Sequence, residues 1–242
     1  MPLTTLRASG DQPQALAVVL AEVARNIFAV CRQQPAGAPL VVGLCGGRSV
    51  VGLLAAVEAE AAAQPADLLG RIQFFMADER LVPLDDEQSN FGGLKRQLFA
   101  ALLARGAIAP AQLHPFITDT SLPDAGCSKY AQELQACGGR FTVVVLGMGE
   151  DGHVAGLFPG HRALADQSAL FLSFHDSPKP PAGRMTASLP LIEGADLSVV
   201  LALGEAKRAA WGALQNPAVS AADCPAKFAT RAKDCILVTD LY

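Results

Sequence analysis

The sequence is short of charge, of aromatic residues and of long uninterrupted apolar runs. Charged residues make up 17% of the 242 residues and aromatic residues 6%, and the formal net charge is −4. No run of basic residues is present, which argues against nucleic acid or an anionic membrane as the main partner. No run of about 18 apolar residues is free of charge, glycine and proline, so we expect no membrane span. Asp11 and its polar neighbours stand where a signal peptide needs an apolar core.

The six cysteines lack the C-x-x-C spacing that is typical of zinc sites. We therefore expect buried, reduced thiols, no metal site and a cytoplasmic location. The sequence also lacks internal repeats and low-complexity linkers, while its 51% of hydrophobic residues are ample material for a core. We expect residues 1–242 to form a single domain, and nothing indicates an obligate protein partner.

Short apolar runs and helical apolar stripes alternate along the chain. Buried strands are predicted at 40–44, 72–76, 141–146, 170–174, 197–203 and 235–238. Helices are predicted at 16–30, 50–63, 91–102, 124–137 and 205–214, the third of them capped by Ser89 or Asn90. Strands that are apolar on both faces and alternate with helices indicate a mostly parallel, twisted sheet with helices on both faces, a Rossmann-like α/β fold.

Unusual residues follow three of these strands. They are Gly46-Gly47-Arg48-Ser49, Asp78-Glu79-Arg80 and Asp151-Gly152-His153. Ligands of open α/β sheets bind beyond the carboxyl ends of the strands, so the coincidence of three such segments at equivalent places indicates one ligand site.

The segment after the third of these strands has two competing interpretations. Its Gly147-x-Gly149-x-x-Gly152 pattern matches a dinucleotide fingerprint, which requires a helix that opens directly at the loop. Pro159-Gly160 interrupts such a helix, and Glu150 would place a carboxylate beside the diphosphate. Acid–base catalysis by Asp151 and His153 is the favoured alternative, although a lone histidine is more often structural.

The other two segments also have ordinary structural interpretations. The glycines at 46 and 47 could let backbone N–H groups bind a phosphate at a helix N-terminus, or they could form a tight turn capped by Ser49. Asp78 and Arg80 could face the ligand cleft, or the charged run could be a solvated loop with an ion pair. The residues alone leave both questions open.

Together, these segments resemble the 6-phosphogluconolactonases, in the wider sugar-phosphate isomerase group that includes glucosamine-6-phosphate deaminase. The resemblance runs nearly from end to end, and it is most specific in the Asp78-Glu79-Arg80 and Gly147-x-Gly149-x-Asp151-Gly152-His153 blocks. Further segments that carry it are Gly46-Gly47 and the stretches at 76–83, 86–92, 157–160, 184–186 and 203–207.

The resemblance implies hydrolysis of 6-phosphoglucono-δ-lactone to 6-phosphogluconate, a step of the oxidative pentose phosphate pathway, without a metal or an organic cofactor. The implied partner is thus a small sugar-phosphate lactone. The resemblance also implies that His153 is the general base, that Asp151 assists it and that Arg80 lies near the substrate. The residues implied as anchors of the sugar phosphate are Gly46, Gly47, Ser49, Arg184 and Lys207.

The chain departs from its relatives in two places. Lactonases commonly have Ser-Gly-Gly-Ser-Thr-Pro in the first loop, where this chain has Cys45-Gly-Gly-Arg-Ser-Val50, and Arg48 could supply charge-assisted bonds to the phosphate. Deaminases carry a glutamate where this chain has Phe158, which favours lactone hydrolysis. A deaminase-like enzyme stays an alternative, as does a non-catalytic sugar-phosphate sensor. A regulator of that kind needs a DNA-binding module, and only about 38 residues precede the first predicted strand.

Overall fold

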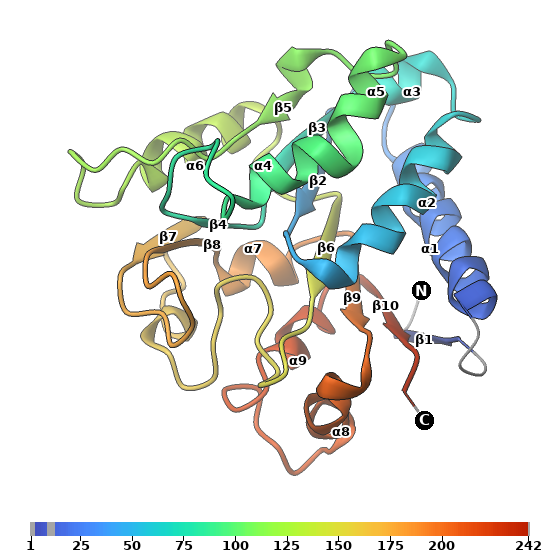
Figure 1. The fold of residues 1–242 in the computed structure, drawn as a ribbon. Coiled ribbons are helices and arrows are strands. Elements are labelled where there is room, and N and C mark those ends of the chain that lie inside the picture. The colour runs from blue at the N-terminus through green and yellow to red at the C-terminus, as the bar shows by residue number, and fades with distance from the viewer. Residues whose placement is uncertain (1–2, 9–12, 242) are drawn as a thin grey trace.

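The structure is a computed structural model that describes residues 3–8 and 13–241. Asp11, on which the signal-peptide argument depends, lies outside these ranges. Within them, seven strands form a central sheet in the order β1-β10-β9-β6-β2-β3-β5, and every neighbouring pair is parallel (Figure 1). The strands are β1 (Thr4–Arg7), β2 (Leu40–Leu44), β3 (Ile72–Met76), β5 (Leu113–His114), β6 (Val143–Gly147), β9 (Leu197–Ala202) and β10 (Asp234–Thr239).

Helices cover both faces of this sheet. Leu44 and Phe74 face α1 (Pro13–Gln33), α2 (Val51–Ala61) and the helical segment from α4 (Asn90–Leu94) through α5 (Ala100–Ala104), and together they enclose an apolar core. On the opposite face, Phe75 packs against Tyr130 of α6 (Cys127–Ala136), and Ser198 donates a hydrogen bond to Ala229 of α9 (Ala226–Ala229). The predicted mostly parallel sheet with helices on two sides is confirmed. The remaining helices are α3 (Ala66–Gly70), α7 (Leu189–Glu193) and α8 (Arg208–Gln215).

The helix predicted around residues 91–102 is interrupted. Ser89 caps α4 by accepting a hydrogen bond from the Gly92 N–H at 3.0 Å, as one of the two proposed caps. A π-helical turn at Lys95–Phe99 then separates α4 from α5. The predicted helix at 205–214 similarly begins as a 3-10 turn, Glu205–Lys207, before α8.

A second sheet differs from the prediction. β4 (Asp78–Arg80), β8 (Arg184–Ala187) and β7 (Phe171–Phe174) pair in antiparallel fashion. The strand predicted at 170–174 therefore belongs to this sheet and not to the parallel one. β1 was also missed, so the prediction that the first strand begins at residue 40 is wrong. Both β1 and β8 have only four residues, too few for a clear apolar run.

One stretch of α1, Gln14–Gln33, is long and apolar enough to cross a membrane by length and composition alone. Charged residues such as Glu22 and Arg25 interrupt this stretch, and for that reason no membrane span is expected from the sequence. The observation is weak evidence for a membrane helix, because the core helix of a folded domain passes the same test. Val23 and Phe28 of this helix are buried in the core.

The strand order creates a crevice at one end of the sheet. β2 is followed in the chain by β3 on one side, whereas β6 adjoins β2 on the other side. The loops that leave the carboxyl ends of β2 and β6 therefore run in opposite directions, which is the switch point where α/β proteins bind ligands.

Candidate active site

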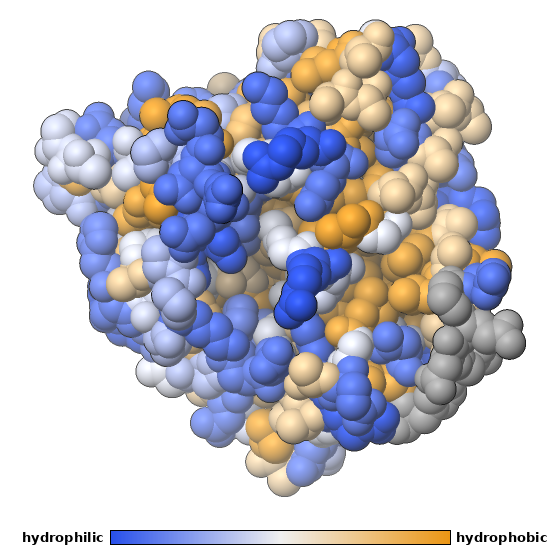
Figure 2. Space-filling model, in the orientation of Figure 1, coloured by the Kyte–Doolittle hydropathy of each residue, from blue (hydrophilic) through white to orange (hydrophobic). Residues whose placement is uncertain are grey.

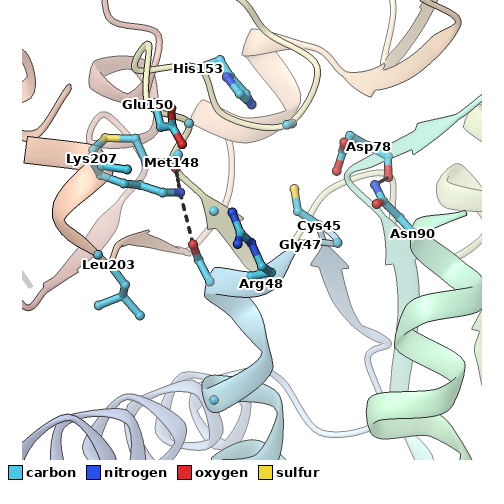
Figure 3. Close-up of a pocket in the computed structure, with 18 of the residues that line it drawn as sticks. Cys45, Gly47, Arg48, Asp78, Asn90, Met148, Glu150, His153, Leu203 and Lys207 are labelled. Carbon is cyan, nitrogen blue, oxygen red and sulfur yellow. Dashed lines mark hydrogen bonds between the residues drawn. The ribbon is translucent and has the colours of Figure 1, made fainter. Parts of the chain in front are cut away.

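A cleft of about 710 Å³ lies at this switch point. The face in Figure 2 is hollowed near its centre, with hydrophilic residues along one side of the hollow and apolar residues toward α1 and α2 on the other. Leu16 and Leu20 of α1 contribute to the apolar wall. All three segments that follow β2, β3 and β6 reach the cleft, and it is also lined by Asn90 of α4, Lys179 and the segment after β9 (Figure 3).

His153 and Asp151 form a hydrogen-bonded pair in the loop after β6. Nδ1 of His153 lies 2.5 Å from Oδ1 of Asp151, and the His153 side chain is 19% exposed. Partial burial would raise the pKa of Asp151, but hydrogen bonds and charges from His153 and Lys179 outweigh it and hold this pKa well below its ordinary range. An ionised carboxylate only accepts hydrogen bonds, so the neutral form of this imidazole carries its proton on Nδ1 and presents Nε2 as the acceptor.

The loop that carries this pair, residues 148–157, is tied to its surroundings by its own backbone. The N–H of Gly156 donates to the Thr186 hydroxyl of β8 at 3.0 Å, and the carbonyl of Gly152 accepts from the Ala226 N–H at 2.9 Å. The N–H of Gly149 donates to the His153 carbonyl at 2.8 Å, and that of Gly152 to the Gly149 carbonyl at 3.0 Å. The N–H groups of Gly149 and Gly152 are therefore bonded within the loop, and that of Gly156 is bonded to β8. The loop is thus neither a phosphate cradle nor the start of a helix.

Two cations, Lys207 and Arg48, meet where the loop after β6 approaches the segment after β2. Lys207 donates from Nζ to the Ser49 hydroxyl at 3.1 Å and to the Met148 carbonyl. Burial lowers the pKa of Lys207, and the nearby charges of Lys179 and Arg48 lower it further, while Glu150 opposes them. Figure 3 shows Arg48, in the 3-10 turn Arg48–Val50 that precedes α2, and Lys207 extending toward the same part of the cleft.

The two glycines before Arg48 have different reasons, close packing for Gly46 and backbone conformation for Gly47. A Cβ atom on Gly46 would lie 2.1 Å from the Asn90 side-chain oxygen, and Gly47 has φ +105°, where side chains are disfavoured. Asn90 is buried, and its amide donates to the Asp78 carbonyl at 3.0 Å.

The Asp78-Glu79-Arg80 run divides its tasks between the cleft and the fold. Asp78, 8% exposed, and Arg80 line the cleft, and Arg80 donates from Nη1 to the Gln88 carbonyl at 2.7 Å. Glu79 is 1% exposed and accepts hydrogen bonds from Ser89 and from the backbone N–H groups of Arg80, Asn90 and Phe91. The solvated-loop interpretation of this run is therefore wrong.

Arg184 is not among the residues that line the cleft. It is 4% exposed within β8, directly opposite Arg80, and its Nη2 donates to the carbonyls of Lys179 at 3.2 Å and Pro180 at 3.0 Å. Burial, followed by the charge of Arg80, lowers the pKa of this guanidinium. Lys179, by contrast, lines the cleft, although the sequence argument did not single it out. The only feature of the sequence that could have pointed to Lys179 is that it is a single cation within a proline-rich stretch.

Cys45 stands where the relatives commonly have serine, and it closes the floor of the cleft. Burial raises the pKa of the Cys45 thiol well above its usual range, and the charge of Asp78 and a hydrogen bond to it act in the same direction. The thiol therefore stays neutral beside Asp78. Within the ranges described, no group of three or more His, Cys, Asp and Glu side chains is arranged to hold a metal ion.

Comparisons with known proteins agree on one family. The sequence model of the glucosamine-6-phosphate isomerases/6-phosphogluconolactonase family matches residues 11–238. The human 6-phosphogluconolactonase is 36% identical over 203 residues, 81% of this chain and 76% of its own, and the Streptomyces coelicolor enzyme of that name is 33% identical over 83% of this chain and 82% of its own.

Solved structures of similar proteins have the same architecture. The 6-phosphogluconolactonase from Trypanosoma brucei has a TM-score of 0.76 and 26% identity, and the match covers 99% of this chain and 96% of that one. A monomeric glucosamine-6-phosphate deaminase has a TM-score of 0.75 over 99% of this chain and 97% of its own, but it is only 18% identical and shows the fold alone.

Proposed function

The chain belongs to the glucosamine-6-phosphate isomerase/6-phosphogluconolactonase family, and from this premise we propose that it hydrolyses 6-phosphoglucono-δ-lactone to 6-phosphogluconate. The relatives cited above that are more than 30% identical are named as 6-phosphogluconolactonases. The observation that carries the proposal is the His153–Asp151 pair, which stands at the switch-point cleft with Nε2 of the imidazole free to accept a proton.

In the proposed reaction, Nε2 of His153 takes a proton from a water molecule while the water oxygen attacks the lactone carbonyl carbon. Asp151 holds the imidazole in the required tautomer and stabilises the imidazolium that forms. The tetrahedral oxyanion then collapses, the bond from the carbonyl carbon to the ring oxygen breaks, and the ring oxygen takes the proton from the imidazolium. The product is an open-chain acid, which ionises in water.

The developing oxyanion needs a donor in the cleft. Because the N–H groups of Gly149 and Gly152 are already bonded within their loop, we assign this task to Arg80, which lines the cleft. Asp78, buried with its carboxylate at the floor, is proposed to accept hydrogen bonds from the sugar hydroxyl groups.

The phosphate is proposed to bind at the wall formed by Lys207, Arg48 and Ser49, with the backbone N–H groups after Gly46 and Gly47 as further donors. Arg184, which the resemblance implies as an anchor, is separated from this wall, and its role is taken up below. We further propose that the enzyme is a single-domain cytoplasmic protein that needs no metal ion, so its activity should survive exhaustive chelation.

One observation argues against the deaminase alternative. Phe158 occupies the position where the deaminases carry a glutamate, and it is 2% exposed with its ring centroid 4.7 Å from that of His153. The site therefore presents an apolar ring beside the imidazole where ring-opening chemistry would use a second carboxylate.

The decisive test is hydrolysis of 6-phosphoglucono-δ-lactone by the wild type and by His153→Ala, corrected for spontaneous hydrolysis. We expect His153→Ala to fold and to be slower by about 10²- to 10⁴-fold, the usual contribution of a general base. His175→Ala, which removes an exposed histidine, should leave the rate unchanged. Turnover of glucosamine 6-phosphate in place of the lactone, or near-normal hydrolysis by His153→Ala, contradicts the proposal.

A further inference from the structure

Asp151 is held on both of its carboxylate oxygens. Oδ1 faces the His153 ring at 2.5 Å, and Oδ2 lies 3.2 Å from Nζ of Lys179. The Asp151 side chain is 34% exposed, so its own surroundings restrict its rotation only in part. The imidazole at Oδ1 and the Lys179 ammonium at Oδ2 together fix the plane of the carboxylate. The plane of the carboxylate in turn sets the direction of the imidazole.

Lys179 itself is held through its backbone. It belongs to the loop of residues 175–183, which links β7 to β8. Its carbonyl accepts from the Ser177 hydroxyl at 2.8 Å and from Nη2 of Arg184 at 3.2 Å, and its N–H donates to the Ser177 hydroxyl at 3.2 Å. Arg184 also reaches the Pro180 carbonyl at 3.0 Å. A buried guanidinium in a strand is thus bonded to the two backbone carbonyls that place the lysine.

We propose that Lys179 is a positioning residue for the Asp151–His153 pair, and that Arg184 acts through Lys179 rather than as an anchor of the substrate phosphate. The chain of contacts runs from Arg184 in β8 to the carbonyl of Lys179, from its ammonium to Asp151, and from Asp151 to the imidazole. This inference rests on the proposed function, because it assigns the two residues to the reaction centre of that activity.

The surroundings of the pair support a positioning role. The groups whose charges or hydrogen bonds reach Asp151 are His153 and Lys179, and Asp151 in turn influences Lys207 and Cys224. Of these, Lys179 supplies the ion pair to the outer oxygen. Lys207 donates to the Ser49 hydroxyl and to the Met148 carbonyl, where the phosphate is proposed to bind, and no ion pair joins it to Asp151 among the described residues. The two lysines of the cleft therefore have separate tasks.

The competing role for Lys179 is direct binding of the phosphate, and the two roles predict different kinetics. A positioning residue changes the chemical step for any lactone, whereas a phosphate ligand matters only when the phosphate is present. Lys179→Met should lower kcat by about 10- to 100-fold on both 6-phosphoglucono-δ-lactone and unphosphorylated glucono-δ-lactone, with little change in KM. Lys179→Arg, which can keep the ion pair, should recover most of the rate.

Two further variants sharpen this experiment. Lys233→Met removes an exposed lysine that is paired at 3.9 Å with Asp196, and it should leave kcat unchanged. Arg184→Lys should lower kcat on both lactones in the wild-type background but add little in the Lys179→Met background, because both changes interrupt one chain of contacts. A loss confined to the phosphorylated lactone, or an unchanged kcat in Lys179→Met, overturns the proposal. Full additivity of the two changes overturns the part assigned to Arg184.

A measurement without substrate separates this inference from the proposed activity. The proton on Nδ1 of His153, shared with Asp151 across 2.5 Å, should give a low-field proton NMR resonance in the wild type. We expect this resonance to be lost by broadening in Lys179→Met and retained in Lys179→Arg and Lys233→Met. A protein that failed to hydrolyse either lactone but showed this pattern would retain the positioning role and lose the proposed function. An unchanged resonance in Lys179→Met overturns the inference whatever the activity.

Discussion

The His153 ring lies against the backbone of Gly149, and this contact explains why the residue must be glycine. A Cβ atom at position 149 would be 2.0 Å from Nδ1 of His153 and 2.7 Å from Oδ1 of Asp151. Gly149 has no positive φ, so the requirement is one of space and not of backbone conformation. The middle glycine of the nucleotide-like pattern in the sequence thus makes room for the Asp151–His153 pair.

We expect Gly149→Ala to lower kcat by about 100-fold or more, because the imidazole and the carboxylate must both move away from the added methyl group. Steady-state kinetics together with circular dichroism would show a folded and impaired enzyme. Gly212→Ala is the matched control, since a Cβ atom there meets nothing within 4 Å and Gly212 lies in α8. Wild-type kinetics in Gly149→Ala would show that the ring is not confined as described.

The low pKa of Asp151 predicts how its contribution to stability depends on pH. A carboxyl group whose pKa is lower in the folded state than the ordinary value of 3.8 stabilises the fold above that value. The contribution disappears as the pH falls through the lower, folded-state pKa. The free energy of unfolding should therefore differ between the wild type and Asp151→Asn at pH 7, and the difference should shrink between pH 4 and pH 2. Urea titrations at several pH values measure this difference, and Asp85→Asn, a change at an exposed position, is the control. A difference that grows toward acid pH would contradict the lowered pKa of Asp151.

At the scale of elements, the Glu79 carboxylate joins β4 to the first turn of α4. It accepts hydrogen bonds from the N–H groups of Asn90 and Phe91 and from the Ser89 hydroxyl, so it satisfies donors that the helix itself leaves unpaired. Burial raises the pKa of Glu79, and the three backbone N–H groups counteract that effect. The raised pKa means that the protonated form of Glu79 is favoured in the folded protein. Its contribution to the free energy of unfolding is therefore fully present at a pH below the ordinary glutamate pKa, and it is lost as the pH rises through the folded-state pKa.

Glu79→Gln should destabilise the protein by about 2 kcal/mol at pH 7, because the new NH₂ group faces backbone donors and leaves them unpaired. Chemical unfolding monitored by fluorescence or circular dichroism measures this loss. Glu87→Gln, a change at an exposed position of the neighbouring loop, should have an effect near zero. Equal stability of Glu79→Gln and the wild type would show that the hydrogen bonds to α4 do not contribute to the fold.

The same elements show what the sequence can and cannot predict. The strands β2, β3, β6, β9 and β10 are buried on both faces over most of their length and appear as mostly apolar runs, so local composition predicts them. The second sheet is different, because the burial of Asp78 and Glu79 in β4 depends on β8, about a hundred residues later, and on α4. Strand-end position alone predicted which segments meet at the cleft, but it could not distinguish Arg184, which points into the fold, from Lys179, which reaches Asp151.

At the scale of the whole molecule, the net charge of −4 means that the proposed anionic substrate is not attracted by a general positive field. Lys207 and Arg48 must act locally, so Lys207→Met should lower kcat/KM for the phosphorylated lactone by about 10- to 100-fold. The loss should be much smaller for glucono-δ-lactone, and added salt should reduce the advantage of the phosphorylated substrate. Lys95→Met, at an exposed position in the π-helical turn, is the control. Equal losses on both lactones would place Lys207 at the reaction centre instead.

The two ends of the chain meet in the sheet, and this fixes the order in which the molecule can be completed on the ribosome. Thr4 pairs with Ile236 and Arg7 with Thr239, so β1 has β10 as its neighbour in the sheet. β1 therefore waits, tens of seconds at about 5–20 residues per second, until residues 234–239 of its neighbour β10 have been synthesised. A nascent chain stalled before residue 234 carries Asp151 and His153 but lacks β10, so β1 has no neighbouring strand with which to pair.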